Sequence, residues 1–262
     1  MVDRSEKFYQ EQYSQYADFE KIIQDEYEII GRVLAAKIAA RFSSTRIVAL
    51  DVGAGTGRMP KTLFRLSKDH QIIFDYMDPV ASALRMYEDS VSPECRGIPI
   101  QSDWASYEPD KQYDLVLANN SFCGIDCSDE GTIRKISAIT KKKGLSLIVL
   151  PSQRGDWVQY AQKYWKSVHQ TPFSKTIFED FAQALAEYSV QHTEDFVEAP
   201  VTLPSIDDEH ILSTVFAVMM YVNRTEIPKR WNDAYVDFSR SVRKQGKLKF
   251  VYGIAECRPD EK

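Results

Sequence analysis

Three glycines alternate with other residues in a short segment that follows an apolar run and an acid. The segment reads "IVALDVGAGTGRM" from Ile47 to Met59, with Asp51 ahead of glycines at positions 53, 55 and 57. Glycine lets a ligand approach the backbone, and a helix that begins after such a loop offers free N–H groups. The segment therefore predicts a ligand-binding loop between a strand and a helix.

The glycine spacing restricts the kind of ligand. Loops that bind dinucleotides read G-x-G-x-x-G and place phosphate at the helix N-terminus. In this chain the third glycine of that pattern is replaced by Arg58. A nicotinamide-dependent dehydrogenase is therefore the least favoured enzyme class.

Polar side chains also end the following strands. Asp78 closes "FDYMDP" 21 residues after Gly57, a position from which a carboxylate can accept hydrogen bonds from both hydroxyls of a ribose. The next two strands end in "QSDWASY" and "YDLVLANNSF". Because ligands of open α/β sheets bind at the carboxyl ends of the strands, these groups are expected to line one site.

The segment "DVGAGTG" resembles motif I of class I S-adenosylmethionine-dependent methyltransferases. The resemblance implies S-adenosylmethionine as cofactor and S-adenosylhomocysteine as product. It also implies that Asp51 lies near the methionine ammonium, that Asp103 reaches the adenine amino group while Trp104 packs on the base, and that Asn119 and Asn120 face the methyl-transfer centre. The full set of cofactor-binding residues expected is Asp51, Gly53, Ala54, Gly55, Gly57, Asp78, Pro79, Asp103, Trp104 and Asn119.

The elements that would position these residues follow a regular alternation. Apolar strands and helices of about ten residues imply a parallel sheet with helices on both faces. We expect a doubly wound, Rossmann-like α/β fold with about seven strands, an antiparallel last strand, N-terminal helices and a helical cap. The expected strands are 46–52, 71–78, 97–103, 113–120, 144–152 and 246–257, and the expected helices are 6–42 (in two parts), 57–67, 81–91, 129–140, 156–168, 174–189, 211–222 and one from Pro228.

The chain is expected to form effectively one domain. Residues 1–45 form an N-terminal helical segment that belongs to the acceptor pocket, residues 46–152 the Rossmann-like cofactor core, and residues 153–262 the cap and closing strands. With 262 residues and 44% hydrophobic content, the chain can build a full core.

Composition excludes several classes of partner. The net charge of -5 disfavours nucleic acid, and the longest apolar run, Ile211 to Val222, is shorter than the roughly 20 residues that span a bilayer. The N-terminus is charged and lacks the apolar core of a signal peptide. We expect a soluble cytoplasmic protein without membrane contact, as a monomer or homodimer. The four cysteines, including the pair in "CGIDC", favour buried thiols over a metal site, and no metal is expected.

Beyond motif I, the whole chain resembles the histamine N-methyltransferase family. The resemblance rests on the N-terminal helical segment, "LDVGAGTGR", the amide after strand four, "PSQRGDWVQYAQKYWKSV", "TIFEDFAQAL" and the final "GKLKFVYG". It implies Asn120 and Glu28 as catalytic residues, with Glu26 an alternative to Glu28. The family's last-strand asparagine falls near Val251 or Tyr252, where no amide stands, so histamine itself is not the expected acceptor. The full set of substrate-binding residues expected is Tyr27, Glu28, Asn120, Phe122, Trp157, Trp165 and Tyr252.

Three functions remain open. The favoured one is methyl transfer to a small-molecule acceptor, at nitrogen rather than oxygen. The second is O-methylation of a carboxylate or hydroxyl on a natural product or peptide. The third is a non-catalytic subunit that binds the cofactor. Base methylation is disfavoured because "ANNSF" contains no proline. A metal-dependent catechol enzyme is disfavoured because the longer segment "ANNSFCGID" offers only Asp126 as an acid.

Overall fold

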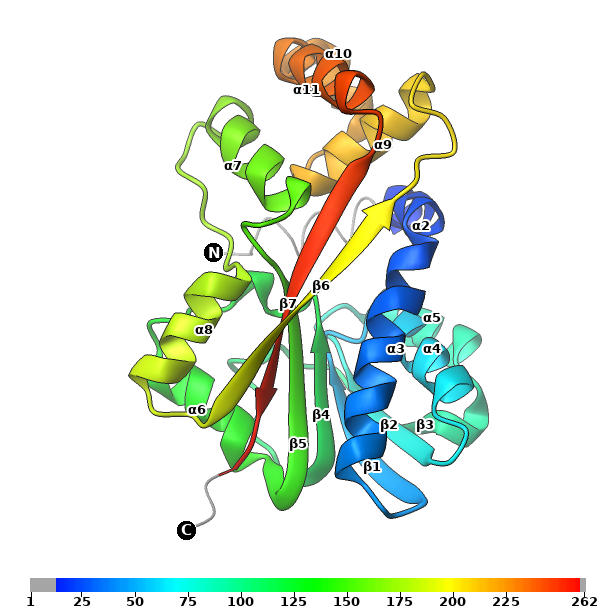
Figure 1. Cartoon of the computed structure of the whole chain (residues 1–262), viewed down its shortest axis with the longest axis vertical. Helices are drawn as coiled ribbons and strands as arrows, with labels where there is room; N and C mark the ends of the chain where they lie inside the picture. Colours follow the sequence, from blue (N-terminus) through cyan, green and yellow to red (C-terminus); the bar gives the residue numbers. More distant parts are fainter. Residues whose placement is uncertain (1–12, 260–262) are drawn as a thin grey trace. The chain divides into compact units, whose positions relative to one another are not determined.

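The computed structural model describes residues 13–259 of the chain (Figure 1). Residues 1–12 of the expected N-terminal segment, and residues 260–262 of the expected cap region, therefore lie outside the described residues. The strands are β1 (Arg46–Val52), β2 (Gln71–Met77), β3 (Arg96–Ile100), β4 (Tyr113–Asn119), β5 (Thr140–Pro151), β6 (His192–Val201) and β7 (Leu248–Cys257). The α-helices are α2 (Tyr13–Ile22), α3 (Gln24–Arg41), α4 (Arg58–Leu66), α5 (Ala81–Ser90), α6 (Glu130–Ala138), α7 (Asp156–His169), α8 (Phe178–Glu187), α9 (Glu209–Met219), α10 (Ile227–Arg230) and α11 (Asn232–Gln245).

The strands form one sheet of seven, in the order β3-β2-β1-β4-β5-β7-β6. β1 pairs in parallel with β2 and β4, β2 with β3, and β4 with β5. β7 runs antiparallel to its neighbours (Figure 1). The predicted doubly wound, mostly parallel sheet with an antiparallel last strand is confirmed.

Alternating side chains of the central strands divide between the two faces of the sheet. Leu50 on β1, Val116 on β4 and Ile148 on β5 belong to one buried cluster with residues of α6 and α8. Because successive side chains of a strand point to opposite faces, Asp51 and Asn119 project from the other face. Figure 1 shows α6 and α8 on one side of the sheet and α3, α4 and α5 on the other.

Two elements differ from the expectation. The strand β6 is not predicted, because its first residues are mostly exposed and polar, and only Val197, Ala199 and Val201 are buried. It is the last strand in the sheet order, and polar residues on such edge strands prevent further pairing. The expected helix from Pro228 is in fact two helices, α10 and α11, because Trp231 between them has a non-helical φ of −134°.

The described chain divides into two compact units. The first contains residues 13–26, 151–175 and 198–251, and the second contains residues 27–150, 176–197 and 252–259. The expected segments 1–45 and 153–262 therefore each contribute to both units. Every cofactor-binding residue predicted from the sequence falls within the second unit. Within residues 13–259, no helix combines the length and the apolar character needed to cross a membrane.

A buried carboxylate ties β2 to β4 inside the second unit. Asp75 is 3% exposed, and its carboxylate accepts a hydrogen bond from the Tyr113 hydroxyl at 3.0 Å and lies 2.6 Å from the Lys111 Nζ. The Tyr113 hydroxyl lies 3.3 Å from that of Tyr107. Since Tyr113 donates its only hydroxyl proton to Asp75, Tyr107 must be the donor to Tyr113. Burial raises the pKa of Tyr113, so its hydroxyl keeps this proton.

The two tyrosines should contribute unequally to stability. Tyr113→Phe removes a hydrogen bond to a charged group and should lower the free energy of unfolding by about 1.5–3 kcal/mol, whereas Tyr107→Phe removes a neutral one, worth about 0.5–1.5 kcal/mol. Urea denaturation of both variants and the parent measures the difference. Equal losses would mean that Asp75 does not depend on Tyr113.

Candidate functional site

The glycine loop between β1 and α4 turns through three left-handed residues. Gly53, Gly55 and Gly57 have φ angles of +64°, +51° and +73°, which residues with a side chain rarely adopt. The Gly57 N–H donates to the Ala54 carbonyl at 2.9 Å, and α4 begins at the next residue, Arg58. Glycine therefore stands where the backbone must turn sharply before the helix.

The three glycines have different surroundings. A Cβ on Gly53 would lie 2.3 Å from the Ser121 Cβ, and one on Gly57 would lie 2.3 Å from a methyl carbon of Val91. A Cβ on Gly55 would meet only the Gly53 carbonyl oxygen among the described residues, at 3.9 Å. Gly53 and Gly57 are thus required by packing, while Gly55 borders open space.

Asp78, at the end of β2, holds this loop in place. One oxygen of its carboxylate accepts from the Gly55 N–H at 3.0 Å and the other from the Val80 N–H at 2.9 Å. The Ala54 N–H donates to the Met77 carbonyl at 2.9 Å, which fastens the loop to the same strand end. Each carboxylate oxygen has a further lone pair, so Asp78 can also accept from ligand hydroxyls. Pro79 follows it and is exposed.

Asp51 is a buried carboxylate at the end of β1. It is 3% exposed, and its Oδ2 has no hydrogen-bond partner among the described residues. Burial, together with the negative charge of Asp78, raises the pKa of Asp51 well above its ordinary value. The Tyr87 hydroxyl is likewise buried and without a partner in the described chain, and burial, followed by the charge of Asp51, raises its pKa. A cationic ligand group would relieve the cost of the Asp51 charge.

The end of β4 presents three more unpartnered polar atoms. Asn119 Oδ1, Asn120 Oδ1 and Ser121 Oγ are shielded from solvent and have no hydrogen-bond partner within residues 13–259. Asn120 is left-handed, with φ +58°, while its N–H donates to the Val149 carbonyl at 2.9 Å. Strained residues of this kind occur often at functional sites.

These groups fit the cofactor implied by motif I. The unpartnered atoms of Asp51, Asn119 and Asn120 are acceptors, which suit the ammonium and amino N–H donors of S-adenosylmethionine. Asp78 suits the ribose hydroxyls, and the open space beside Gly55 allows a ligand to approach the backbone. The chemistry that the bound cofactor supplies is an electrophilic methyl group on a positively charged sulfur.

Asp103 and Trp104 occupy the loop after β3 with different degrees of burial. The exposed Asp103 carboxylate accepts from the Ser106 N–H at 2.7 Å and from its hydroxyl at 3.2 Å. Trp104 is 6% exposed, and its indole N–H donates to the Thr132 carbonyl at 3.1 Å. Asp103 shapes a local turn and Trp104 is part of the core, while their contact with adenine stays a prediction.

The residues predicted for the acceptor are distributed over several environments. Tyr27 lies under the Arg58 guanidinium, 4.5 Å from the ring centroid. Phe122 is 1% exposed and packs against Trp104, with ring centroids 5.1 Å apart. Tyr252 is fully buried on β7. Asn120 is the predicted acceptor residue that stands beside the glycine loop, next to Ser121.

Glu28 lies in ion pairs on the surface of the second unit. Its carboxylate pairs with Arg65 on α4 and, at 3.2 Å, with Arg32 one turn further along α3. The hydrogen bond from Arg65 is the main cause that lowers the pKa of Glu28. The two arginines thus account for its charge without an amine ligand, and its catalytic role remains a prediction only.

Trp157 and Trp165 lie on α7 in the first unit. Trp157 packs against Phe19 and Phe250, with centroid distances of 5.6 Å and 5.3 Å. Trp165 is 3% exposed and lies 4.1 Å from His169 between ring centroids. Both tryptophans therefore contribute to the packing of this unit, and a role in the acceptor pocket stays a prediction.

Sequence reasoning missed Ser121 and Tyr87. Ser121 directly follows Asn120, and the close approach of Gly53 makes it part of the same edge. Tyr87 lies on α5, where only the packing of that helix brings it within electrostatic reach of Asp51. Within residues 13–259, no cluster of three or more His, Cys, Asp or Glu side chains could hold a metal ion.

Comparison with solved structures shows the same fold in other proteins. The plantazolicin methyltransferase BpumL, solved with a pentazolic desmethylPZN analog and SAH, has a TM-score of 0.58 at 11% identity, with 98% of this chain and 95% of that chain covered. The YcgJ protein of Bacillus subtilis has a TM-score of 0.53 at 14% identity, covering 87% and 98%. The [4+2]-cyclase SpnF also has a TM-score of 0.53 at 14% identity, covering 87% and 80%. At these identities the likeness concerns the fold alone.

The sequence itself matches one curated relative and one family model. Malonyl-[acyl-carrier protein] O-methyltransferase 2 of Ilyobacter polytropus is 27% identical over 125 residues, which are 47% of this chain and 47% of the relative. The chain thus matches about half the length of this curated relative. The family model described as "Methyltransferase domain" matches residues 25–189, more than half of the chain. The chain therefore belongs to the methyltransferase domain family and has the Rossmann-like fold of the class I S-adenosylmethionine-dependent methyltransferases.

Proposed function

We propose that this protein transfers a methyl group from S-adenosylmethionine to a small-molecule acceptor. The observation that carries the proposal is the set of unpartnered buried acceptor atoms on Asp51, Asn119 and Asn120, beside the left-handed glycine loop. The transfer forms a bond between the acceptor atom and the methyl carbon and breaks the carbon–sulfur bond, whose electron pair stays on sulfur. Alignment of the two reactants can lower such a barrier by about 7–11 kcal/mol.

The polar groups at the end of β4 indicate which kinds of acceptor atom the protein can methylate. Asn119 and Asn120 are neutral amides, which can orient an acceptor but cannot remove its proton. A hydroxyl acceptor usually needs a base, whereas a carboxylate or a neutral amine already has its lone pair available. Nitrogen, favoured by the resemblance to histamine N-methyltransferases, stays a prediction. Carboxylate oxygen is the second candidate, supported by the partial identity with an O-methyltransferase of malonyl-[acyl-carrier protein].

Cofactor binding is tested by paired glycine variants. Gly55→Ala should lower the free energy of unfolding by about 1–2 kcal/mol from left-handed strain alone. Gly57→Ala should lower it by about 1–3 kcal/mol more than Gly55→Ala does, because its Cβ also meets Val91. In calorimetry, S-adenosylhomocysteine should bind the parent, and Gly55→Ala should weaken this binding at least about tenfold.

Gly246 provides the control for backbone strain. It has φ +77° and, among the described residues, nothing within 4 Å of an added Cβ, so Gly246→Ala introduces similar strain away from the loop. It should leave the affinity for S-adenosylhomocysteine unchanged. No binding heat with the parent protein, or equal affinity in the Gly55→Ala variant, would contradict the proposal that the glycine loop binds the cofactor.

Asp51 should make cofactor binding depend on pH. In the free protein its pKa lies well above the ordinary value, and a bound ammonium would lower it. Between these two pKa values binding releases a proton, so affinity should rise with pH and level off once free Asp51 is ionised. Calorimetry in buffers of different ionisation enthalpy measures the proton released.

The Asp51→Asn variant separates binding from folding. It should lose both the affinity and its pH dependence, whereas Asp110→Asn, which removes an exposed carboxylate, should keep both. Because the unfolded chain ionises Asp51 at lower pH than the folded chain, the charge opposes folding above the ordinary pKa. Asp51→Asn should therefore be more stable than the parent at neutral pH without cofactor. An unchanged pH profile in this variant would refute the contact with the ammonium.

The acceptor is tested with methyl-tritiated S-adenosylmethionine and matched small molecules. Aromatic amines, their carboxylic acid counterparts, their phenols and a malonyl thioester form the panel. We expect transfer to an amine or a carboxylate and none to the phenols, because the amides of β4 cannot remove a proton. Methyl esters release volatile methanol in mild alkali and N-methyl products do not, which distinguishes oxygen from nitrogen. Tight binding of S-adenosylhomocysteine without transfer to any acceptor would instead favour the non-catalytic subunit.

A further inference from the structure

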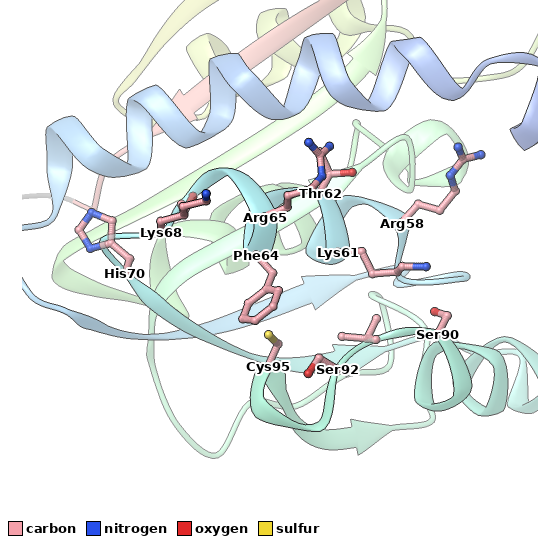
Figure 2. A pocket seen from close by; sticks show the side chains of 12 residues that line it. Arg58, Lys61, Thr62, Phe64, Arg65, Lys68, His70, Ser90, Ser92 and Cys95 are labelled. Atoms are coloured by element: carbon pink, nitrogen blue, oxygen red, sulfur yellow. The ribbon is translucent and has the colours of Figure 1, made fainter.

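A basic groove lies along α4 in the second unit, on the side away from its buried residues. The groove has a volume of about 810 Å³ (Figure 2). Its lining contains no carboxylate, although the chain carries a net charge of -5. The lining residues are Arg58, Lys61, Thr62, Phe64, Arg65, Ser67, Lys68, His70, Ser90, Val91, Ser92 and Cys95.

The cations of the groove differ in how far they are already used. Arg65 pairs with Glu28, and the Arg58 guanidinium lies over the Tyr27 ring. Lys61 and Lys68 are exposed, and the part of the chain that the structure describes gives neither an ion pair. These two lysines are therefore the charges available to a partner.

An exposed aromatic ring stands between these lysines. Phe64 is 43% exposed, and Figure 2 shows its ring directed from α4 toward Cys95 on the opposite wall. Lys61 lies on α4, whereas Lys68 lies in the turn just after α4 ends at Leu66, so the two lysines stand on either side of Phe64 along the chain. Because the charges are spread rather than convergent, the groove suits an extended partner better than a single phosphate.

We propose that this groove binds an acidic amphipathic helix of a partner protein. A helix with carboxylates on either side of an apolar side chain would match the charges of Lys61 and Lys68 and the exposed ring of Phe64 between them. Opposite charges would speed association, and burial of Phe64 would add the apolar contact. The inference does not rest on the proposed methyl transfer, because neither lysine belongs to the cofactor site.

The test uses a fluorescein-labelled peptide of about 18 residues, long enough for helix formation, with glutamates on either side of leucines along one helical face. Fluorescence anisotropy with the full-length protein should show binding that weakens as salt rises. Lys61→Glu with Lys68→Glu should weaken binding by about tenfold or more, and Phe64→Ser should also weaken it. Lys142→Glu with Lys143→Glu makes the same charge change at two other exposed lysines and should leave binding unchanged.

Several outcomes would overturn the proposal. They are absence of binding, an equal loss in the control pair, or equal binding by a peptide whose leucines are replaced by serine. Displacement of the peptide from the parent protein by inorganic triphosphate or by phosphatidylserine vesicles at lower concentration would show a general anion site instead. Calorimetry with S-adenosylhomocysteine on the same variants keeps the two proposals separate, because the affinity for the cofactor should not change.

Discussion

The contact between Gly53 and Ser121 brings the ends of β1 and β4 so close that no side chain fits between them. A Cβ on Gly53 would lie 2.3 Å from that of Ser121, so the loop after β1 and the turn after β4 form one surface. Asp78 joins the end of β2 to this surface through the Gly55 N–H. Parallel pairing brings the three carboxyl ends to one edge of the sheet, and the glycine contact makes that edge continuous.

Two buried aspartates in this sheet differ in how far the surrounding residues compensate their charge. Asp75, within β2, is compensated by Lys111, Tyr113 and the Ile98 N–H, so its charge stabilises the connection between β2 and β4. Asp51, at the end of β1, has one oxygen without a partner in the described chain and a second carboxylate nearby. The first acid is compensated within the fold, whereas one oxygen of the second is left available to a ligand. This difference is why we assign Asp51 to a ligand.

The distribution of charge separates two faces of α4. The helix begins at the glycine loop, and its buried face carries Met59, Pro60 and Leu63. Its other face carries Arg58, Lys61 and Arg65, which line the basic groove in a protein that is acidic as a whole. One short helix thus takes part in both the cofactor loop and the proposed binding surface.

The sequence by itself determined six of the seven strands, the glycine loop and the positions of Asp51, Asp78 and Asn119 at strand ends. These features depend on local periodicity and on the backbone freedom of glycine, which can be recognised in short segments. Only the tertiary structure decided which of the predicted side chains remain available. Glu28 is paired with Arg65, 37 residues away, and Trp104 lies in the core, whereas the acceptor atoms of Asp51, Asn119 and Asn120 have no partner in the described chain. The edge strand β6 could also be recognised only in the structure, because its mostly polar first residues lack the alternation of apolar and polar residues that indicates a strand. The partners of a side chain depend on how elements distant in the sequence pack together, and a local sequence pattern carries no information on that packing.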